Sequence, residues 1–137
     1  MRGTIHHVDL TVKSAEVSRA FYESVLGFMG YTLSDTTQVG FDFDLRTPVA
    51  PFTSIGIRDA DGPNAMRKHD RNTIGLHHLA WAAESRADVD AMHQHLLSIG
   101  ATVLHPPADY PEYGPTYYAV FFADPDGMKL EYVHKPD

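Results

Sequence analysis

Residues 4–12 read Thr-Ile-His-His-Val-Asp-Leu-Thr-Val, and residues 75–82 read Gly-Leu-His-His-Leu-Ala-Trp-Ala. Both stretches alternate between apolar and polar or small positions, which is the pattern of a half-buried strand. In each copy a serine, Ser14 or Ser85, follows the second histidine after seven residues. Strand, histidine pair and serine therefore recur at an offset of 71 residues. This repetition predicts two copies of one structural unit.

A helix is predicted behind each serine, because a serine hydroxyl can accept a hydrogen bond from an amide of the first helical turn. Each helix is expected to end at a glycine, Gly27 or Gly100, which suits the left-handed conformation that often follows a helix. Two sets of apolar residues at helical spacing predict the buried faces: Val17, Ala20, Phe21 and Val25 in the first helix, and Val89, Met92, Leu96 and Ile99 in the second.

Three more strands are predicted after each helix, at about residues 30–34, 38–45 and 52–58 and at about residues 102–104, 116–123 and 128–134. Asp-Pro-Asp-Gly at residues 124–127 predicts the hairpin turn between the last two. The segment 106–115 contains four prolines and is expected to form a loop over one end of the sheet.

These elements predict one α+β domain over residues 1–137. It consists of two tandem β-α-β-β-β units, at residues 1–59 and 75–137, which form mixed β-sheets. A polar linker at residues 60–74 joins the two units.

The composition restricts the classes of partner. With 11 basic and 18 acidic side chains the net charge is −7, so we expect no nucleic-acid partner. Cysteine is absent, which excludes disulfides and thiolate metal ligands. No segment has the apolar length of a membrane span, and the first seven residues do not resemble a signal peptide. We therefore expect a cytoplasmic protein with no membrane partner.

Strand alternation predicts which side chains share a face. His7 and Asp9 lie opposite the apolar residues of the first strand, and His78 takes the equivalent position in the second copy. Glu131 places a carboxylate in the last predicted strand. Two imidazoles and one carboxylate suit a divalent first-row metal. From the residues alone, ordinary hydrogen-bonded strand histidines are an equally good interpretation.

Four pieces of the sequence resemble the vicinal oxygen chelate superfamily: IHHVDLTV, SRAFYESVLGF, GLHHLAWAAES and FFADPDGMKLEYV. This superfamily includes glyoxalase I, methylmalonyl-CoA epimerase, extradiol dioxygenases, fosfomycin-resistance enzymes and bleomycin-binding proteins. The resemblance implies cleft-shaped sheets, a homodimer, and a divalent zinc, nickel, manganese, cobalt or iron ion bound by His7, His78 and Glu131. It also implies a small-molecule substrate that chelates the metal through vicinal oxygens, with Glu131 as both ligand and catalytic base.

One departure from the family pattern narrows the expected chemistry. Members like glyoxalase I have a fourth ligand in the first unit, at the counterpart of Glu131. Here that counterpart is Gly56, or Arg58 if the register shifts by two, and neither binds a metal. The upstream histidine of ring-cleaving dioxygenases is also missing from the stretch 112–123. Lyase or isomerase chemistry is therefore expected in preference to ring cleavage.

The substrate pocket is expected to include Asp9, Arg58, Tyr113 and Tyr118. A basic segment at residues 67–71 is a further candidate for contact with an anionic substrate. The alternative hypothesis is a metal-free protein that sequesters a small molecule, like the bleomycin-binding proteins, which lack the triad of two histidines and a glutamate. A third is a purely structural relative with neither activity.

Overall fold

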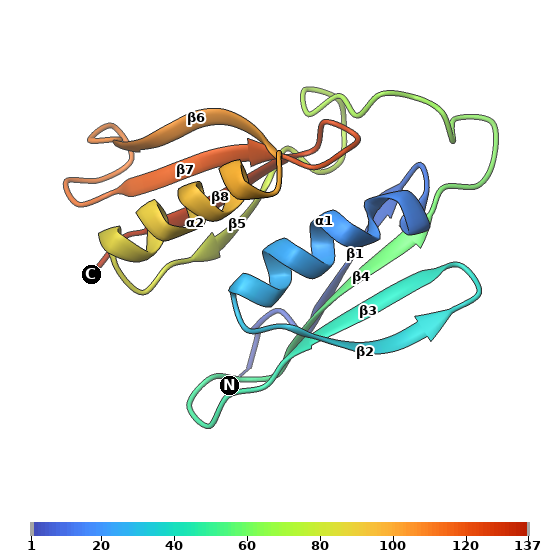
Figure 1. Cartoon of the computed structure of the whole chain (residues 1–137), viewed down its shortest axis with the longest axis horizontal. Helices are drawn as coiled ribbons and strands as arrows, with labels where there is room; N and C mark the ends of the chain where they lie inside the picture. Colours follow the sequence, from blue (N-terminus) through green and yellow to red (C-terminus); the bar gives the residue numbers. More distant parts are fainter. Residues whose placement is uncertain (1, 137) are drawn as a thin grey trace. The chain divides into compact units, whose positions relative to one another are not determined.

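Each half of the chain forms a helix packed on a four-stranded sheet. The computed structural model describes residues 2–136, and its internal contacts divide the chain into two compact units between Arg67 and Lys68. Figure 1 shows one helix and one sheet in each unit. No helix among residues 2–136 combines the length and hydropathy needed to span a membrane.

The sheet of the first unit has the strand order β1-β4-β3-β2, and helix α1 follows β1. Strands β1 and β4 run parallel, whereas the other neighbours are antiparallel. The elements of this unit are β1 His7–Val12, α1 Ala15–Phe28, β2 Thr32–Thr37, β3 Gly40–Leu45 and β4 Thr53–Asp59.

The second unit repeats this topology, with the strand order β5-β8-β7-β6 and a parallel pair between β5 and β8. Its elements are β5 Leu79–Ala82, α2 Arg86–Ser98, β6 Thr102–Asp109, β7 Tyr118–Ala123 and β8 Lys129–His134. The predicted fold of two β-α-β-β-β units is thus confirmed. His7 opens β1, whereas His78 lies one residue before β5.

Both serine caps form as predicted. The Ser14 hydroxyl accepts from the amide of Val17 at 3.2 Å, and the Ser85 hydroxyl accepts from the amide of Asp88 at 3.0 Å. The Asp88 carboxylate in turn accepts from the amide of Glu84 at 3.0 Å. Each cap satisfies amides that the first helical turn leaves unpaired.

The buried face of α1 differs from the predicted one. Val17 is 74% exposed and Ala20 is also exposed, whereas the helix buries Ala15, Ser18, Tyr22, Val25 and Leu26. Of the four predicted residues, Val25 is buried and Phe21 is half-buried, so the prediction holds in part. The stripe also includes a tyrosine and a serine, which a pattern of apolar residues alone does not select. The helix also runs past Gly27 to Phe28, and Gly30, with φ of +94°, takes the left-handed position.

Helix α2 follows the prediction more closely. Val89, Met92 and Leu96 are fully buried, while Ile99 is 38% exposed because it forms the C-cap. Gly100 adopts the predicted left-handed conformation, with φ of +68°. Burial of each such side chain stabilises a fold by about 1.5–3 kcal/mol, so the helix–sheet interface holds each unit together.

The proline-rich segment is not the loop that the sequence predicts. Strand β6 runs through Pro106 and Pro107 to Asp109, paired with β7. Two features make this possible: β6 is an edge strand, and its pairing register shifts between His105 and Ala108, which leaves both prolines outside the ladder. A proline without an amide hydrogen is tolerated at such edges and bulges.

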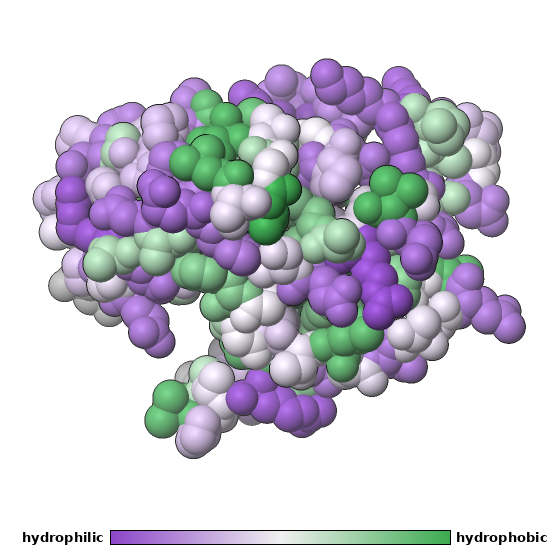
Figure 2. All heavy atoms as spheres, viewed as in Figure 1, coloured by the Kyte–Doolittle hydropathy of each residue, from purple (hydrophilic) through white to green (hydrophobic). Residues whose placement is uncertain are grey.

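The face of the molecule drawn in Figure 2 is predominantly polar. In Figure 2 hydrophilic side chains cover much of the visible face, and apolar side chains occur in separate groups. Candidate functional residues are therefore expected on the faces of the two sheets.

Candidate functional site

The second unit buries a carboxylate in the middle of its sheet. Glu131 lies on β8 between Ala80 of β5 and Phe121 of β7, and it is only 1% exposed. Its neighbour Tyr132 points to α2, where its hydroxyl donates to Asp88 at 2.6 Å. Because strand neighbours alternate, Glu131 lies on the face opposite the helix. A buried charge at such a place requires compensating partners.

Both carboxylate oxygens of Glu131 have a partner. The hydroxyl of Tyr117 donates a short hydrogen bond to Oε1, and Nε2 of His78 lies 3.2 Å from Oε2. Burial, followed by the hydrogen bond to Glu131 and the carboxylate charge, raises the pKa of Tyr117 well above its ordinary value. The phenol therefore stays protonated and remains a donor to Glu131 at neutral pH.

The ring of His78 is also held from its other side. Its Nδ1 lies 2.7 Å from Nδ1 of His77, so one of the two nitrogens carries the shared hydrogen. Partial desolvation, with the charges of His78, Arg71 and Lys129, lowers the pKa of His77. Through its Nδ1, a neutral His77 can either accept a hydrogen bond from Nδ1 of His78 or donate one to it.

Two tautomers satisfy this geometry. If Nδ1 of His78 donates to His77, Nε2 faces Oε2 of Glu131, and either a second proton on His78 or a metal ion must lie between these two acceptors. If His77 donates instead, Nε2 of His78 carries a hydrogen and donates to Glu131. The first arrangement is that of a metal-binding histidine whose other nitrogen is oriented by a hydrogen bond.

The separation of the two donors fits a shared metal ion. Ligand bonds of about 2.1 Å at octahedral or tetrahedral angles place neighbouring donors about 3.0–3.4 Å apart, and His78 Nε2 and Glu131 Oε2 are 3.2 Å apart. Within residues 2–136 no group of three or more histidine, aspartate or glutamate side chains is arranged to hold a metal. The second unit therefore presents two of the three predicted ligands as a pair.

The third predicted ligand, His7, belongs to the first unit. It is exposed, and its Nδ1 lies 3.1 Å from Nδ1 of His6. The histidine contact of the second unit is thus repeated in the first. Of the predicted metal ligands, the structure brings His78 and Glu131 together.

The first unit has no carboxylate where the second has Glu131. Asp9 pairs with Gly56 as Ala80 pairs with Glu131. The space over Gly56 holds the carboxylate of Asp9 and the guanidinium of Arg58, which lies 2.6 Å from Asp42 and 3.5 Å from Asp9. Two of the predicted pocket residues, Asp9 and Arg58, are therefore engaged with one another.

The other two predicted pocket residues, Tyr113 and Tyr118, occupy different environments. The Tyr118 hydroxyl donates to Asp90 of α2 at 2.6 Å, and its ring lies 3.8 Å beneath the guanidinium carbon of Arg86. Tyr118 therefore belongs to the helix side of the sheet. Tyr113 is 58% exposed and lies in an aromatic group near Glu131.

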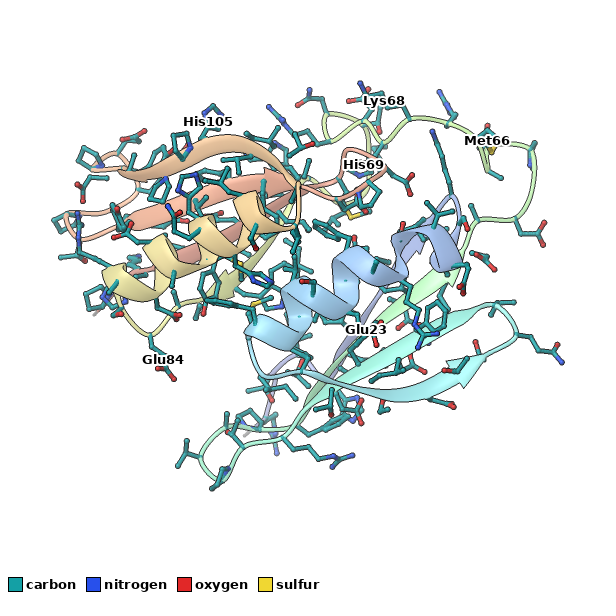
Figure 3. All side chains as sticks on the ribbon, viewed as in Figure 1. Glu23, Met66, Lys68, His69, Glu84 and His105 are labelled. Atoms are coloured by element: carbon teal, nitrogen blue, oxygen red, sulfur yellow. The ribbon has the colours of Figure 1, made fainter. Side chains whose placement is uncertain are left out.

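This aromatic group is built from Tyr110, Tyr113 and Tyr117, which we call the tyrosine cluster. Tyr110 stacks on Tyr113 at 5.9 Å between ring centroids, and Tyr117 approaches Tyr113 edge-on at 5.4 Å. Phe121, opposite Glu131 on β7, lies 5.3 Å from Tyr110 and 5.9 Å from the His105 ring. Figure 3 labels His105 on β6, at the edge of this sheet. The cluster thus forms an aromatic wall beside Glu131.

Tyr117 was not among the predicted site residues. The hairpin turn predicted at residues 124–127 pairs β7 with β8 and places Phe121 opposite Glu131. Alternation from Phe121 back to Tyr117 then predicts that Phe121 and Tyr117 both lie on the face of Glu131. The hydrogen bond itself was not predictable, because Tyr117 lies just outside β7.

A family comparison identifies the fold. The model of the Glyoxalase/Bleomycin resistance protein/Dioxygenase superfamily matches residues 4–132. The chain belongs to this superfamily. The predicted resemblance is therefore confirmed.

Relatives within the superfamily cover the chain almost completely. An uncharacterised protein of Bacillus subtilis, YqjT, is 34% identical over 94% of this chain and 97% of its own length. A 2-epi-5-epi-valiolone epimerase from an Actinomyces species is 31% identical over 96% of this chain and 79% of its own length.

Solved structures agree with this assignment. A crystal structure of a candidate glyoxalase from Bacillus halodurans has a TM-score of 0.80 and 30% identity, and it covers 98% of this chain and 97% of its own. The lactoylglutathione lyase of Agrobacterium tumefaciens has a TM-score of 0.65 at 21% identity, covering 96% of this chain and 93% of its own. The second likeness shows the fold alone.

Proposed function

We propose that the protein is a divalent-metal-dependent enzyme that moves a proton at a carbon beside a carbonyl group, in lyase or isomerase chemistry. Its substrate is a small molecule with oxygens on neighbouring carbons. The observation that carries this proposal is the 3.2 Å approach of His78 Nε2 to Oε2 of the buried Glu131. Two such donors at ligand spacing are the core of a metal site.

His78, Glu131 and His7 are the proposed ligands. His7 is included because the repeat gives it the position of His78 in the first unit. When bound, the metal would stabilise negative charge on the substrate oxygens as a Lewis acid. A donor set of two imidazoles and one carboxylate suits zinc, nickel, manganese, cobalt or iron.

Glu131 is the proposed base. One of its oxygens faces His78, and the other accepts from Tyr117, so the carboxylate is fixed in orientation before a substrate arrives. It takes a proton from the substrate carbon and later returns it, with no change in oxidation state. Burial of the carboxylate excludes competing water from this transfer.

The comparison with an epimerase supports this reaction class. A relative that is 31% identical over 96% of this chain is a 2-epi-5-epi-valiolone epimerase, and an epimerase inverts one carbon centre. Its substrate is not assigned to this chain.

Metal content tests the proposal. Wild-type protein reconstituted in zinc, nickel, manganese, cobalt or iron and then desalted should hold about one ion per chain, measured by plasma mass spectrometry. His78→Ala should lose most of the metal and keep its circular dichroism spectrum. Glu131→Gln keeps the side-chain shape but removes the ligand charge, so its metal affinity should fall. His93→Ala, a histidine of α2, is the matched control and should retain the metal. Wild-type protein that remains empty in all five metals would exclude the proposal.

A second candidate function is metal-free sequestration of a planar small molecule. The stacked tyrosine cluster favours it, because exposed aromatic rings bind flat ligands. Fluorescence titration with planar aromatic compounds, with and without a chelator, separates the candidates. Binding unchanged by the chelator in metal-free protein would favour sequestration.

We further propose a homodimer, as the family resemblance implies. Sedimentation equilibrium should then give twice the chain mass of 15.2 kDa. A single species at 15.2 kDa would contradict it.

A further inference from the structure

An open cavity of about 480 Å³ lies on the second unit, and none of the proposed metal ligands is among its lining residues. It is lined by Gly127 of the turn between β7 and β8 and by the segment Lys68–Asn72, which precedes β5. Figure 3 shows Lys68 and His69 on this segment, beside that turn. The same segment lies in the hydrophilic region at the top of Figure 2.

Three of the lining side chains can carry positive charge: Lys68, His69 and Arg71. Among residues 2–136, none of the three forms an ion pair with a carboxylate. The only acid of the segment, Asp70, uses Oδ1 to accept from the amide of Asn72 at 2.9 Å. The lining thus carries two permanent cations, Lys68 and Arg71, against one carboxylate, Asp70, in a chain whose net charge is −7.

The stem of Lys68 lies close to the turn that carries Gly127. The Cε atom of Lys68 lies 3.8 Å from the position that a Cβ of residue 127 would take. Gly127 has φ of +83°, a conformation that glycine adopts readily, and it has no side chain to displace the lysine stem.

We propose that this cavity binds the phosphate group of a small phosphate monoester. Lys and Arg side chains with convergent donors recognise phosphate through charge-assisted hydrogen bonds, and a dianion gains more from them than a carboxylate does. The volume lies within the range of small-molecule sites and leaves room for the organic part of the ester. The proposed phosphate site shares no residue with the proposed metal ligands.

Calorimetric titration with inorganic phosphate and with methyl phosphate, at constant ionic strength, tests the site. Wild-type protein should bind each with one saturable site per chain. The double variant Lys68→Gln/Arg71→Gln should weaken binding by about tenfold or more, since each charge-assisted bond is lost. Arg67→Gln removes the same kind of charge one residue outside the lining, and its affinity should stay within about twofold of wild type.

Two further arms keep the result unambiguous. His78→Ala should bind phosphate as wild type does, which separates this site from phosphate held on a metal. Arg71→Gln alone, which should weaken binding by a smaller factor, replaces the double variant if the latter melts early. The proposal is overturned by absence of saturable phosphate binding, by equal loss in Arg67→Gln, by loss in His78→Ala, or by acetate binding more tightly than phosphate.

Discussion

Gly56 and Glu131 occupy the same place in the two units. Gly56 on β4 pairs with Asp9 of β1, and Glu131 on β8 pairs with Ala80 of β5. Ala80 follows Asp9 by 71 positions, which is the offset of the repeat. One copy of the repeated unit therefore has a buried carboxylate here, and the other has no side chain at all. The sequence expectation that Gly56 is the counterpart of Glu131 is confirmed by the strand register.

Adding a methyl group at Gly56 should destabilise the first unit. A Cβ there would lie 2.3 Å from Oδ1 of Asp9 and 2.9 Å from a guanidinium nitrogen of Arg58, so their ion pair must move. We expect Gly56→Ala to lower the free energy of unfolding by about 1–3 kcal/mol, measured by urea denaturation.

Gly27→Ala is the matched control for this substitution. Gly27 lies within α1 with nothing within 4 Å of its Cβ position, so alanine should stabilise by about 0.5–1 kcal/mol. Asp9→Ala combined with Gly56→Ala should recover part of the loss, because the closest obstacle is gone. If Gly56→Ala is as stable as wild type, Asp9 and Arg58 do not pack closely over Gly56.

Removal of the Tyr117 hydroxyl should act on Glu131 rather than on the fold. In Tyr117→Phe, Oε1 of Glu131 loses its donor, so the carboxylate is less firmly oriented toward His78. We expect a weaker metal affinity, by about tenfold, and a changed visible spectrum of the cobalt-loaded protein.

Tyr118→Phe is the control for Tyr117→Phe. It removes a hydroxyl from the next residue, but one that bonds Asp90 on the helix side of the sheet. Its cobalt spectrum should match wild type. Identical spectra for Tyr117→Phe and wild type would show that Tyr117 does not position Glu131.

Asp88 should stabilise the second unit more than an ordinary helix cap does. Its carboxylate accepts from the amide of Glu84 at 3.0 Å and from the hydroxyl of the buried Tyr132 at 2.6 Å. Asp88→Ala should therefore cost about 2–3 kcal/mol, against about 1 kcal/mol for Ser85→Ala, which removes one cap bond. Thermal and urea denaturation measure both, and equal losses would contradict a role for Tyr132.

Alkaline pH should destabilise the second unit through Tyr132. Burial first, and then the hydrogen bond to Asp88, raise the pKa of Tyr132 above its ordinary value near 10. The raised pKa means that stability is fully present below about pH 10 and falls as pH rises toward the folded pKa. Wild type should lose stability above pH 10 faster than Tyr132→Phe does, as measured by denaturation between pH 8 and 11. Parallel pH profiles would exclude this cause.

Much of the fold follows from local sequence. The repeat of strand, histidine pair and serine predicted two equivalent units, because strand alternation and helix capping depend on residues close in the chain. The same alternation placed Glu131 opposite Leu130 and Tyr132, as the burial of both neighbours against the helix side confirms.

Only tertiary structure decided the other features, because each depends on residues distant in sequence. The face of α1 that is buried depends on the shape of the sheet beneath it, which accepts Tyr22 and Ser18 and leaves Val17 in water. Pro106 and Pro107 enter a strand because β6 is the edge of its sheet, a property of strand order rather than of the segment.

The candidate site was likewise predicted in part from the sequence and decided in part by the tertiary structure. The sequence singled out His78 and Glu131 from their residue types and repeat positions. Their 3.2 Å approach, and the hydrogen bond from Tyr117, depend on the parallel pairing of β5 with β8 and on the chain that enters β7. A sequence specifies which chemical groups a strand presents and on which face. The folded sheet decides which of these groups meet, since a distance between side chains arises only when separate strands are placed side by side.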